Sequence, residues 1–207
     1  MKLNIWFSRI LLTVITIYTS LATSQTLLIL GDSLSASYNI PQESGWVSLL
    51  SNRLDKEYPT IKVMNASIAG ETTRNALKRL PAIIEKHKPS YVIIELGGND
   101  GLRGFDLKSV KNNLKKMIEL SQQSGAKVLL TGIHIPPNYG KAYTELFYRT
   151  YLQLSKEYNT GFVPFILEGI GGNAKLMQGD GIHPKADAQP LVLDNMWPHI
   201  DKMLSKN

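Results

Sequence analysis

The sequence predicts a single α/β domain built around a parallel β-sheet, and three observations support this fold class. Five short apolar runs alternate with longer segments in which apolar residues recur at three- and four-residue spacing. The middle runs are continuously aliphatic or β-branched, which is typical of strands buried on both faces of a parallel sheet. No linker rich in proline, glycine and serine divides the 207 residues, a length that fits one domain with its own core.

The expected strands and helices alternate along the chain, as in a succession of right-handed strand–helix–strand crossovers. Strands are expected at residues 26–30, 61–64, 91–96, 127–133 and 162–165. Helices are expected at residues 46–58, 72–87, 107–123, 142–158 and 186–204. Because the carboxyl ends of parallel strands share one edge of the sheet, we expect the loops that follow the strands to converge and to form the ligand site there.

The first 24 residues differ from the rest of the chain. Lys2 and Arg9 are the only charged residues before Asp32, and residues 10–22 are mostly apolar and are followed by small residues. This pattern is typical of a secretory signal peptide, so we expect residues 1–24 to be removed and residues 25–207 to form the domain. The alternative is an uncleaved anchor helix; after removal of the signal no stable membrane span is expected. The expected location is periplasmic or secreted.

Composition excludes several classes of site. The chain has no cysteine, which excludes disulfides, thiolate metal sites and a cysteine nucleophile. Loss of the signal peptide lowers the formal net charge from +6 to about +4. The basic residues lack the interleaved aromatic side chains of a surface that binds single-stranded nucleic acid. No nucleic-acid partner is therefore expected.

Four polar, glycine-rich segments either follow an expected strand or precede the last expected helix. Their sequences are GDS at 31–33, NASIAG at 65–70, GGND at 97–100 and GDGIHP at 179–184. If the sheet is parallel, all four segments lie at one rim. Each segment alone is a weak signal, because glycine, aspartate and serine are the commonest turn-forming residues.

Together, the four segments supply every part of a serine hydrolase site. Such a site needs a nucleophilic hydroxyl, a base, a group that orients the base, and donors for the developing oxyanion. Ser33 is the candidate nucleophile, His183 the base and Asp180 the orienting carboxylate. The candidate oxyanion donors are the backbone N–H groups of Ser33 and Gly70 and the side-chain amide of Asn99.

Other residues near these segments have competing interpretations. His134 follows the fourth expected strand and is a rival base, although a place in the wall of a substrate groove is the favoured interpretation. Two loops either line an apolar groove for an acyl chain or are simply packed loops. The groove candidates are Leu102, Arg103, His134, Ile135 and Pro136. Asp32 and Asp100 are interpreted as structural residues that brace their turns.

Block by block, the sequence resembles the SGNH/GDSL hydrolases in GDSL at 31–34, Gly70, GND at 98–100 and DGIH at 180–183. The longer strings at 31–38 and 95–104 are similar to one branch, the bacterial periplasmic multifunctional acyl-CoA thioesterases, lysophospholipases and arylesterases. The resemblance implies a flavodoxin-like three-layer α/β/α sandwich with a five-stranded parallel sheet and no metal or organic cofactor. It also implies a triad of Ser33, Asp180 and His183 and an oxyanion hole of Ser33, Gly70 and Asn99.

The resemblance implies hydrolysis of esters and thioesters that carry acyl chains. Because acyl-CoA is cytosolic and the chain carries an export signal, lysophospholipids and other membrane-derived esters are the expected natural substrates. We expect a monomer. Two other functions stay open: a carbohydrate O-deacetylase that uses the same triad, and a noncatalytic lipid- or glycan-binding protein with the same fold.

Overall fold

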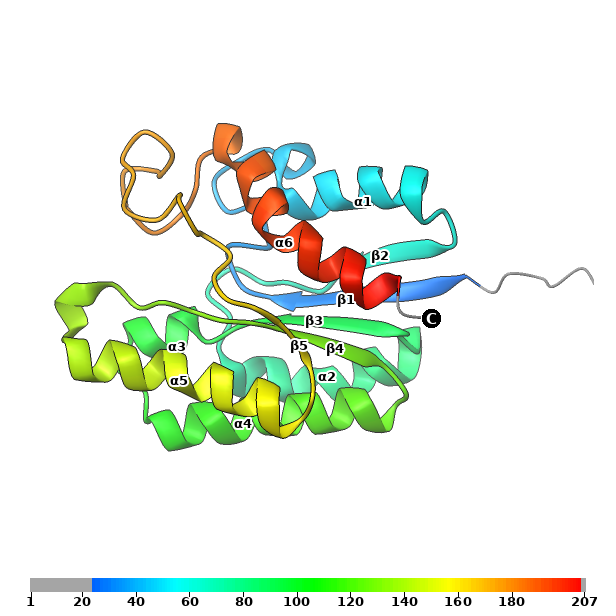
Figure 1. The fold of residues 1–207 in the computed structure, drawn as a ribbon, viewed down its shortest axis with the longest axis horizontal. Helices are drawn as coiled ribbons and strands as arrows, with labels where there is room; N and C mark the ends of the chain where they lie inside the picture. The colour runs from blue at the N-terminus through cyan, green and yellow to red at the C-terminus, as the bar shows by residue number, and fades with distance from the viewer. Residues whose placement is uncertain (1–23, 206–207) are drawn as a thin grey trace, which may run out of the picture.

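A parallel β-sheet runs through the centre of the protein in the computed structural model, which describes residues 24–205 (Figure 1). All four strand pairings are parallel, and the strand order is β2-β1-β3-β4-β5. The strands are β1 (Gln25–Gly31), β2 (Ile61–Asn65), β3 (Tyr91–Glu95), β4 (Lys127–Thr131) and β5 (Gly161–Val163). This order is the flavodoxin-like one, and it has its topological switch point between β1 and β3. The predicted fold class is confirmed.

Helices cover both faces of the sheet (Figure 1). On one face lie α1 (Trp46–Glu57) and α6 (Gln189–Leu204). On the other lie α2 (Thr73–His87), α4 (Leu107–Gln123) and α5 (Lys141–Glu157). Leu27 and Ile29 of β1 pack with the first layer, whereas Leu28 and Leu30 pack with the second. Burial on both faces explains why β1 is continuously apolar rather than alternating.

Local hydrogen bonds set the ends of several helices. The Thr72 hydroxyl accepts from the backbone N–H of Asn75 and caps α2, and the Asp106 carboxylate accepts from that of Ser109 and caps α4. Short 3₁₀ turns are η1 (Gln42–Ser44), η2 (Pro137–Tyr139) and η3 (Ala186–Ala188). Among residues 24–205, no helix combines the length and the apolar character that crossing a membrane requires.

The structure differs from the expected elements mainly at the edge that holds the site. Expected strands at 127–133 and 162–165 end earlier, at Thr131 and Val163, and Pro164, which has no N–H to donate to a ladder, follows β5. A short helix, α3 (Gly98–Leu102), replaces the loop expected after β3. Gly97 enters this helix with a φ of 112°, a conformation open to glycine. The expected signal peptide, residues 1–24, lies outside the described residues except for its last position.

Candidate active site

Ser33 lies in the turn that leaves β1 at the switch point of the sheet. The Asp32 carboxylate accepts from the backbone N–H of Leu34 at 3.1 Å, and the Asp32 carbonyl accepts from the N–H of Ala36 at 3.0 Å. These bonds brace the turn, as expected for Asp32. A Cβ on Gly31 would lie 2.8 Å from the Ser35 side chain and 2.9 Å from Glu95 Oε2. The tight packing therefore requires glycine immediately before this turn.

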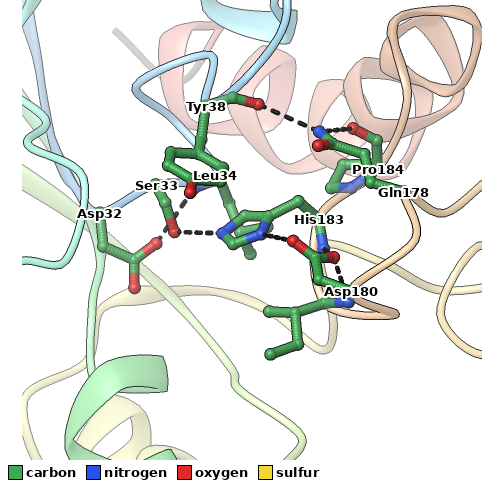
Figure 2. Close-up of polar contacts among 9 residues, drawn as sticks. Asp32, Ser33, Leu34, Tyr38, Gln178, Asp180, His183 and Pro184 are labelled. Atoms are coloured by element: carbon green, nitrogen blue, oxygen red, sulfur yellow. Dashed lines mark hydrogen bonds and ion pairs between the residues drawn. The ribbon is translucent and has the colours of Figure 1, made fainter.

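His183 and Asp180 reach Ser33 from the loop that precedes η3 (Figure 2). The Ser33 Oγ lies 2.8 Å from His183 Nε2, and His183 Nδ1 lies 2.7 Å from Asp180 Oδ2. A carboxylate can only accept, so Nδ1 carries the hydrogen and Nε2 is left to accept from the Ser33 hydroxyl. The structure thus brings together all three residues that the sequence nominated for the triad.

Asp180 is held as a carboxylate by its own loop. Its Oδ1 accepts from the backbone N–H groups of Ile182 and His183 at 2.9 and 3.0 Å. Partial burial opposes ionisation, but the hydrogen bonds from the His183 ring and from these two N–H groups outweigh it and lower the pKa of Asp180 to about 2. Gly181 has a φ of 69°, which lets the chain turn tightly enough for these bonds. Asp180 is therefore charged wherever His183 is needed as a base.

A cavity of about 270 Å³, the Ser33 cavity, contains the candidate oxyanion donors. Ser33, Gly70, Asn99 and His183 all line it. Within residues 24–205, the backbone N–H groups of Ser33 and Gly70 have no protein acceptor. The Asn99 amide gives one hydrogen to Asp32 Oδ2 at 3.2 Å, which leaves its second hydrogen for another acceptor. Two backbone donors and one amide hydrogen are therefore available around this cavity.

The loop that carries Gly70 is fixed from three sides. The Asn65 amide donates to the Ser35 carbonyl at 2.9 Å, and the Ile68 N–H donates to the Gly31 carbonyl at 3.2 Å. Arg79 donates to the Ala66 carbonyl at 2.5 Å. Gly70 itself has a φ of 77°, the left-handed region that favours glycine. These contacts hold Gly70 beside the turn of Ser33.

Two buried carboxyl groups lie at the end of β1 and β3. Gly31 pairs with Glu95 in the sheet, and Glu95 Oε2 accepts from the Ser35 hydroxyl at 2.7 Å and from the Asp32 N–H at 3.4 Å. Burial raises the pKa of Asp32 to about 6, against the hydrogen bonds from Leu34 and Asn99 and the attraction of His183. Burial, followed by repulsion from Asp32, holds the pKa of Glu95 well above its usual range. Burial therefore disfavours the charged form of Glu95, which braces the nucleophile turn as a hydrogen-bond acceptor.

A second cavity, of about 350 Å³ and mainly apolar, adjoins the Ser33 cavity. The two cavities share Asp32, Leu34, Gly98, Leu102 and Ile182 in their walls. The other apolar side chains in the wall of the apolar cavity are Ile133, Ile135, Pro136, Pro137, Phe165, Leu167 and Met177. A chain of methylene groups attached to a carbonyl at Ser33 could therefore continue into an apolar space.

The groove candidates divide into two sets. Leu102, His134, Ile135 and Pro136 line the apolar cavity. Arg103 is outside the described walls of both cavities and donates to the Gly70 carbonyl at 3.4 Å. The ring of His134 packs on Tyr148 at 4.1 Å and on Phe165 at 4.7 Å, measured between centroids. His183, not His134, contacts the Ser33 hydroxyl.

Asp100 has the structural place expected for it. Its buried carboxylate accepts from the Thr73 N–H at 2.9 Å and from the Thr73 hydroxyl at 2.6 Å, and so connects α3 to the start of α2. Two residues at the site, Tyr38 and Gln178, were not among the candidates predicted from the sequence. Tyr38 lies in the wall of the Ser33 cavity, and the Gln178 side-chain amide donates to the Tyr38 carbonyl. The available sequence signal is their position within or next to the site motifs, in GDSLSASY for Tyr38 and MQGDGIHP for Gln178.

Known proteins resemble the chain over nearly all of the domain. The GDSL-like Lipase/Acylhydrolase family matches residues 29–189. Esterase TesA of Pseudomonas aeruginosa is 48% identical over 186 residues, which cover 90% of this chain and 92% of that protein. Thioesterase 1/protease 1/lysophospholipase L1 of Escherichia coli K12 is 41% identical over 184 residues, which cover 89% of this chain and 87% of that protein.

Solved structures give the same result. The psychrotrophic esterase EstA from Pseudoalteromonas sp., in a structure inhibited by monoethylphosphonate, has a TM-score of 0.84 and 46% identity and covers 88% of this chain and 100% of that one. AlinE4, an SGNH-hydrolase family esterase, has a TM-score of 0.72 and 32% identity over 87% of this chain and 97% of that one. The predicted family is confirmed. The chain belongs to the GDSL-like lipase/acylhydrolase family and is an ester hydrolase.

Proposed function

We propose that the chain hydrolyses carboxylic esters and thioesters of linear acyl chains through an acyl-enzyme on Ser33. The observation that carries the proposal is the continuous line of short contacts from Asp180 through His183 to Ser33. This line ends in the Ser33 cavity, which holds the candidate oxyanion donors and adjoins the apolar cavity. A carbonyl group fits the first environment and an acyl chain fits the second.

Acylation begins when the Ser33 proton moves to His183 Nε2 and Oγ bonds to the substrate carbonyl carbon. The negative charge that develops on the carbonyl oxygen is stabilised by the N–H groups of Ser33 and Gly70 and by the Asn99 amide. The C–O or C–S bond to the leaving group then breaks. The leaving alkoxide or thiolate takes the proton from Nε2, which leaves the acyl group on Ser33.

Deacylation repeats these steps with water. A water molecule gives a proton to His183 Nε2 and its oxygen attacks the acyl carbon. The bond to Ser33 Oγ breaks, Oγ recovers the proton, and a carboxylic acid leaves. Throughout both steps, the charge of Asp180 stabilises the imidazolium and keeps the ring in one orientation. Its lowered pKa maintains that charge across the range in which a neutral His183 acts as a base.

Natural substrates, in this proposal, are lysophospholipids and other membrane-derived esters. The expected signal peptide supports an exported, periplasmic or secreted enzyme, where acyl-CoA is absent. One chain supplies Ser33, His183, Asp180, Gly70 and Asn99, so a monomer is sufficient for the reaction. Intact-mass measurement of the protein released from a periplasmic extract tests the export. A mass that retains residues 1–24 would contradict cleavage there.

The reaction is tested with p-nitrophenyl esters of increasing chain length and with the variant Ser33→Ala. We expect hydrolysis to extend to acyl chains of about eight or more carbons, because the apolar cavity can bury their methylene groups. Ser33→Ala should lower turnover by at least about 1000-fold. Activity confined to acetate would favour a carbohydrate O-deacetylase. Function that survives in Ser33→Ala would favour a noncatalytic lipid- or glycan-binding protein.

A further inference from the structure

The ring of Tyr38 packs against the ring of His183, the residue that connects Ser33 to Asp180 (Figure 2). The two centroids are 4.4 Å apart, and the planes are tilted by 38°. Tyr38 is 41% exposed, so burial of the ring is not what holds it in place. Its neighbours Ser37 and Asn39 both have a φ of 56°, in the left-handed region that non-glycine residues seldom adopt. Such conformations concentrate at functional sites, where the surrounding structure maintains them.

Gln178 supplies the contact that holds this segment. Its side-chain amide donates one hydrogen bond to the Tyr38 carbonyl at 3.0 Å and another to the Pro184 carbonyl at 3.1 Å (Figure 2). Its backbone N–H donates to the His183 carbonyl at 2.7 Å. Gln178 therefore bonds both to the backbone of His183 and, through the Tyr38 carbonyl, to the segment that carries Ser33.

Few other contacts connect these two segments. Within residues 24–205, two hydrogen bonds join residues 178–185 to residues 31–40: the Ser33–His183 contact and the Gln178–Tyr38 contact. The first must break and re-form in every turnover, because the Ser33 oxygen becomes acylated. The second involves no reacting atom and can persist through the cycle. Met177 and Pro184, which pair with each other, are buried and anchor the base of the loop, whereas Asp180, Gly181 and Ile182 at its tip are exposed.

We propose that Tyr38 and Gln178 form a clamp that positions His183 for proton transfer with Ser33. Both are positioning residues, and the inference rests on the proposed hydrolysis at Ser33. Gln178 sets the separation of the two segments while Ser33 is acylated. The face of the Tyr38 ring limits rotation of the imidazole and favours the imidazolium that forms as Ser33 loses its proton.

The first test replaces Gln178 by methionine, which keeps the length of the side chain and removes its donors. Gln178 is absent from the described walls of both cavities, so substrate contacts should be retained. We expect Gln178→Met to lower kcat and the rate of Ser33 labelling by a fluorophosphonate about 10-fold, with KM changed less than about twofold. The labelling endpoint should still reach one per chain. Gln122→Met is the matched control, because Gln122 likewise donates to a tyrosine carbonyl, that of Tyr158 at 2.8 Å, but on α4.

The second test separates the Tyr38 ring from its hydroxyl. Tyr38→Phe keeps the ring face and Tyr38→Leu removes it, so kcat should be about 10-fold lower in Tyr38→Leu than in Tyr38→Phe. The exposure of Tyr38 makes both variants compatible with folding, so this pair decides the question even where Gln178→Met folds poorly. Equal losses in Tyr38→Phe and Tyr38→Leu would contradict a role for the ring.

The outcomes distinguish the clamp from a purely structural role. A variant that only folds less well reaches a lower labelling endpoint but keeps the wild-type rate for each labelled site, and that result for Gln178→Met would overturn the clamp. Wild-type rates in both Gln178→Met and Tyr38→Leu would overturn it as well. If the wild-type chain itself does not react at Ser33, the proposed hydrolysis fails, and the clamp fails with it.

Discussion

Asp180 lies in an exposed loop beside His183, whereas Asp32 and Glu95 lie buried where β1 and β3 end. Both regions contact the nucleophile segment through hydrogen bonds, but the loop favours the charged carboxylate and the buried edge disfavours it. The loop surrounds Asp180 with three hydrogen bonds, and the pKa falls to about 2. The sheet edge removes two carboxyl groups from water, and burial raises the pKa of both.

The two regions therefore have different roles at the site. The charge that stabilises His183 comes from a loop in which solvent and backbone N–H groups support a carboxylate. The buried acids serve the site as hydrogen-bond acceptors: Asp32 for Asn99 and Leu34, and Glu95 for Ser35. Substitutions in the exposed loop should therefore change the chemistry, and substitutions at the buried edge should change stability and its dependence on pH.

The largest effect is expected for Asp180→Asn. An amide at this position cannot hold the ring in the required tautomer or stabilise the imidazolium, so kcat should fall by about 1000- to 10,000-fold. The chain should still fold, because the asparagine carbonyl oxygen can accept from the N–H groups of Ile182 and His183, and thermal unfolding checks this. Asp187→Asn, an exposed aspartate in η3, is the control and should keep full activity. A loss below about tenfold in Asp180→Asn would show that the carboxylate is not part of the proton-transfer chain.

A smaller loss is expected for Asn99→Ala, which removes one proposed oxyanion donor. The kcat should fall by about 100- to 1000-fold, while KM for a p-nitrophenyl ester should change little. Asn113→Ala is the matched control, since the Asn113 amide donates to the Thr73 hydroxyl at 3.0 Å and does not line the Ser33 cavity. A similar kcat loss in both variants would point to indirect structural damage.

The buried edge should be revealed by the pH dependence of stability. The pKa of Asp32 and that of Glu95 are both raised in the folded chain, so the folded chain binds more protons than the unfolded chain between about pH 4 and pH 6. This pair therefore lowers the free energy of unfolding as pH rises through that range. Glu95→Gln keeps an acceptor for Ser35 but removes the charge, and it should reduce this loss.

Urea denaturation at pH 5 and pH 8 measures the difference. We expect the free energy of unfolding to fall less between pH 5 and pH 8 in Glu95→Gln than in the wild type. Glu43→Gln, a change at an exposed glutamate of η1, should follow the wild type at both values. Parallel pH profiles for Glu95→Gln and the wild type would contradict the raised pKa of the buried acid.

The smallest effect is expected for His134→Leu. The His134 ring packs on Tyr148 and Phe165 in the wall of the apolar cavity, and partial burial lowers its pKa. Leucine should leave acetyl ester hydrolysis unchanged and shift the preference among longer chains by about threefold. His87→Leu, at the end of α2, is the control. Loss of activity on every chain length in His134→Leu would make His134 a rival base again.

Much of this arrangement is predictable from the sequence because it depends on strong local patterns. The continuous apolar runs at β1 and β3 predicted the buried strands, and GDS, GND and DGIH marked the ends at which side chains converge. Glycine and proline at the rim made the ends of β4 and β5 less predictable, and the glycines of GNDGL hid α3.

The rest depends on contacts between distant residues. Nothing around Gln178 indicates that its amide reaches Tyr38, 140 residues earlier. Glu95 ends an apolar run and has no sequence feature that marks it as a buried, raised-pKa acid. Such contacts become visible only when β1 and β3 lie side by side and the loop before η3 folds back over them.

The most direct test of the account is a crystal structure of the enzyme inactivated with a long-chain alkylphosphonate. We expect a bond between phosphorus and Ser33 Oγ, and a phosphonyl oxygen within hydrogen-bond distance of Gly70 N and Asn99 Nδ2. The alkyl chain should lie in the apolar cavity, against Ile135 and Phe165. A phosphonate on another residue, or an alkyl chain directed into solvent with this cavity unoccupied, would contradict the account.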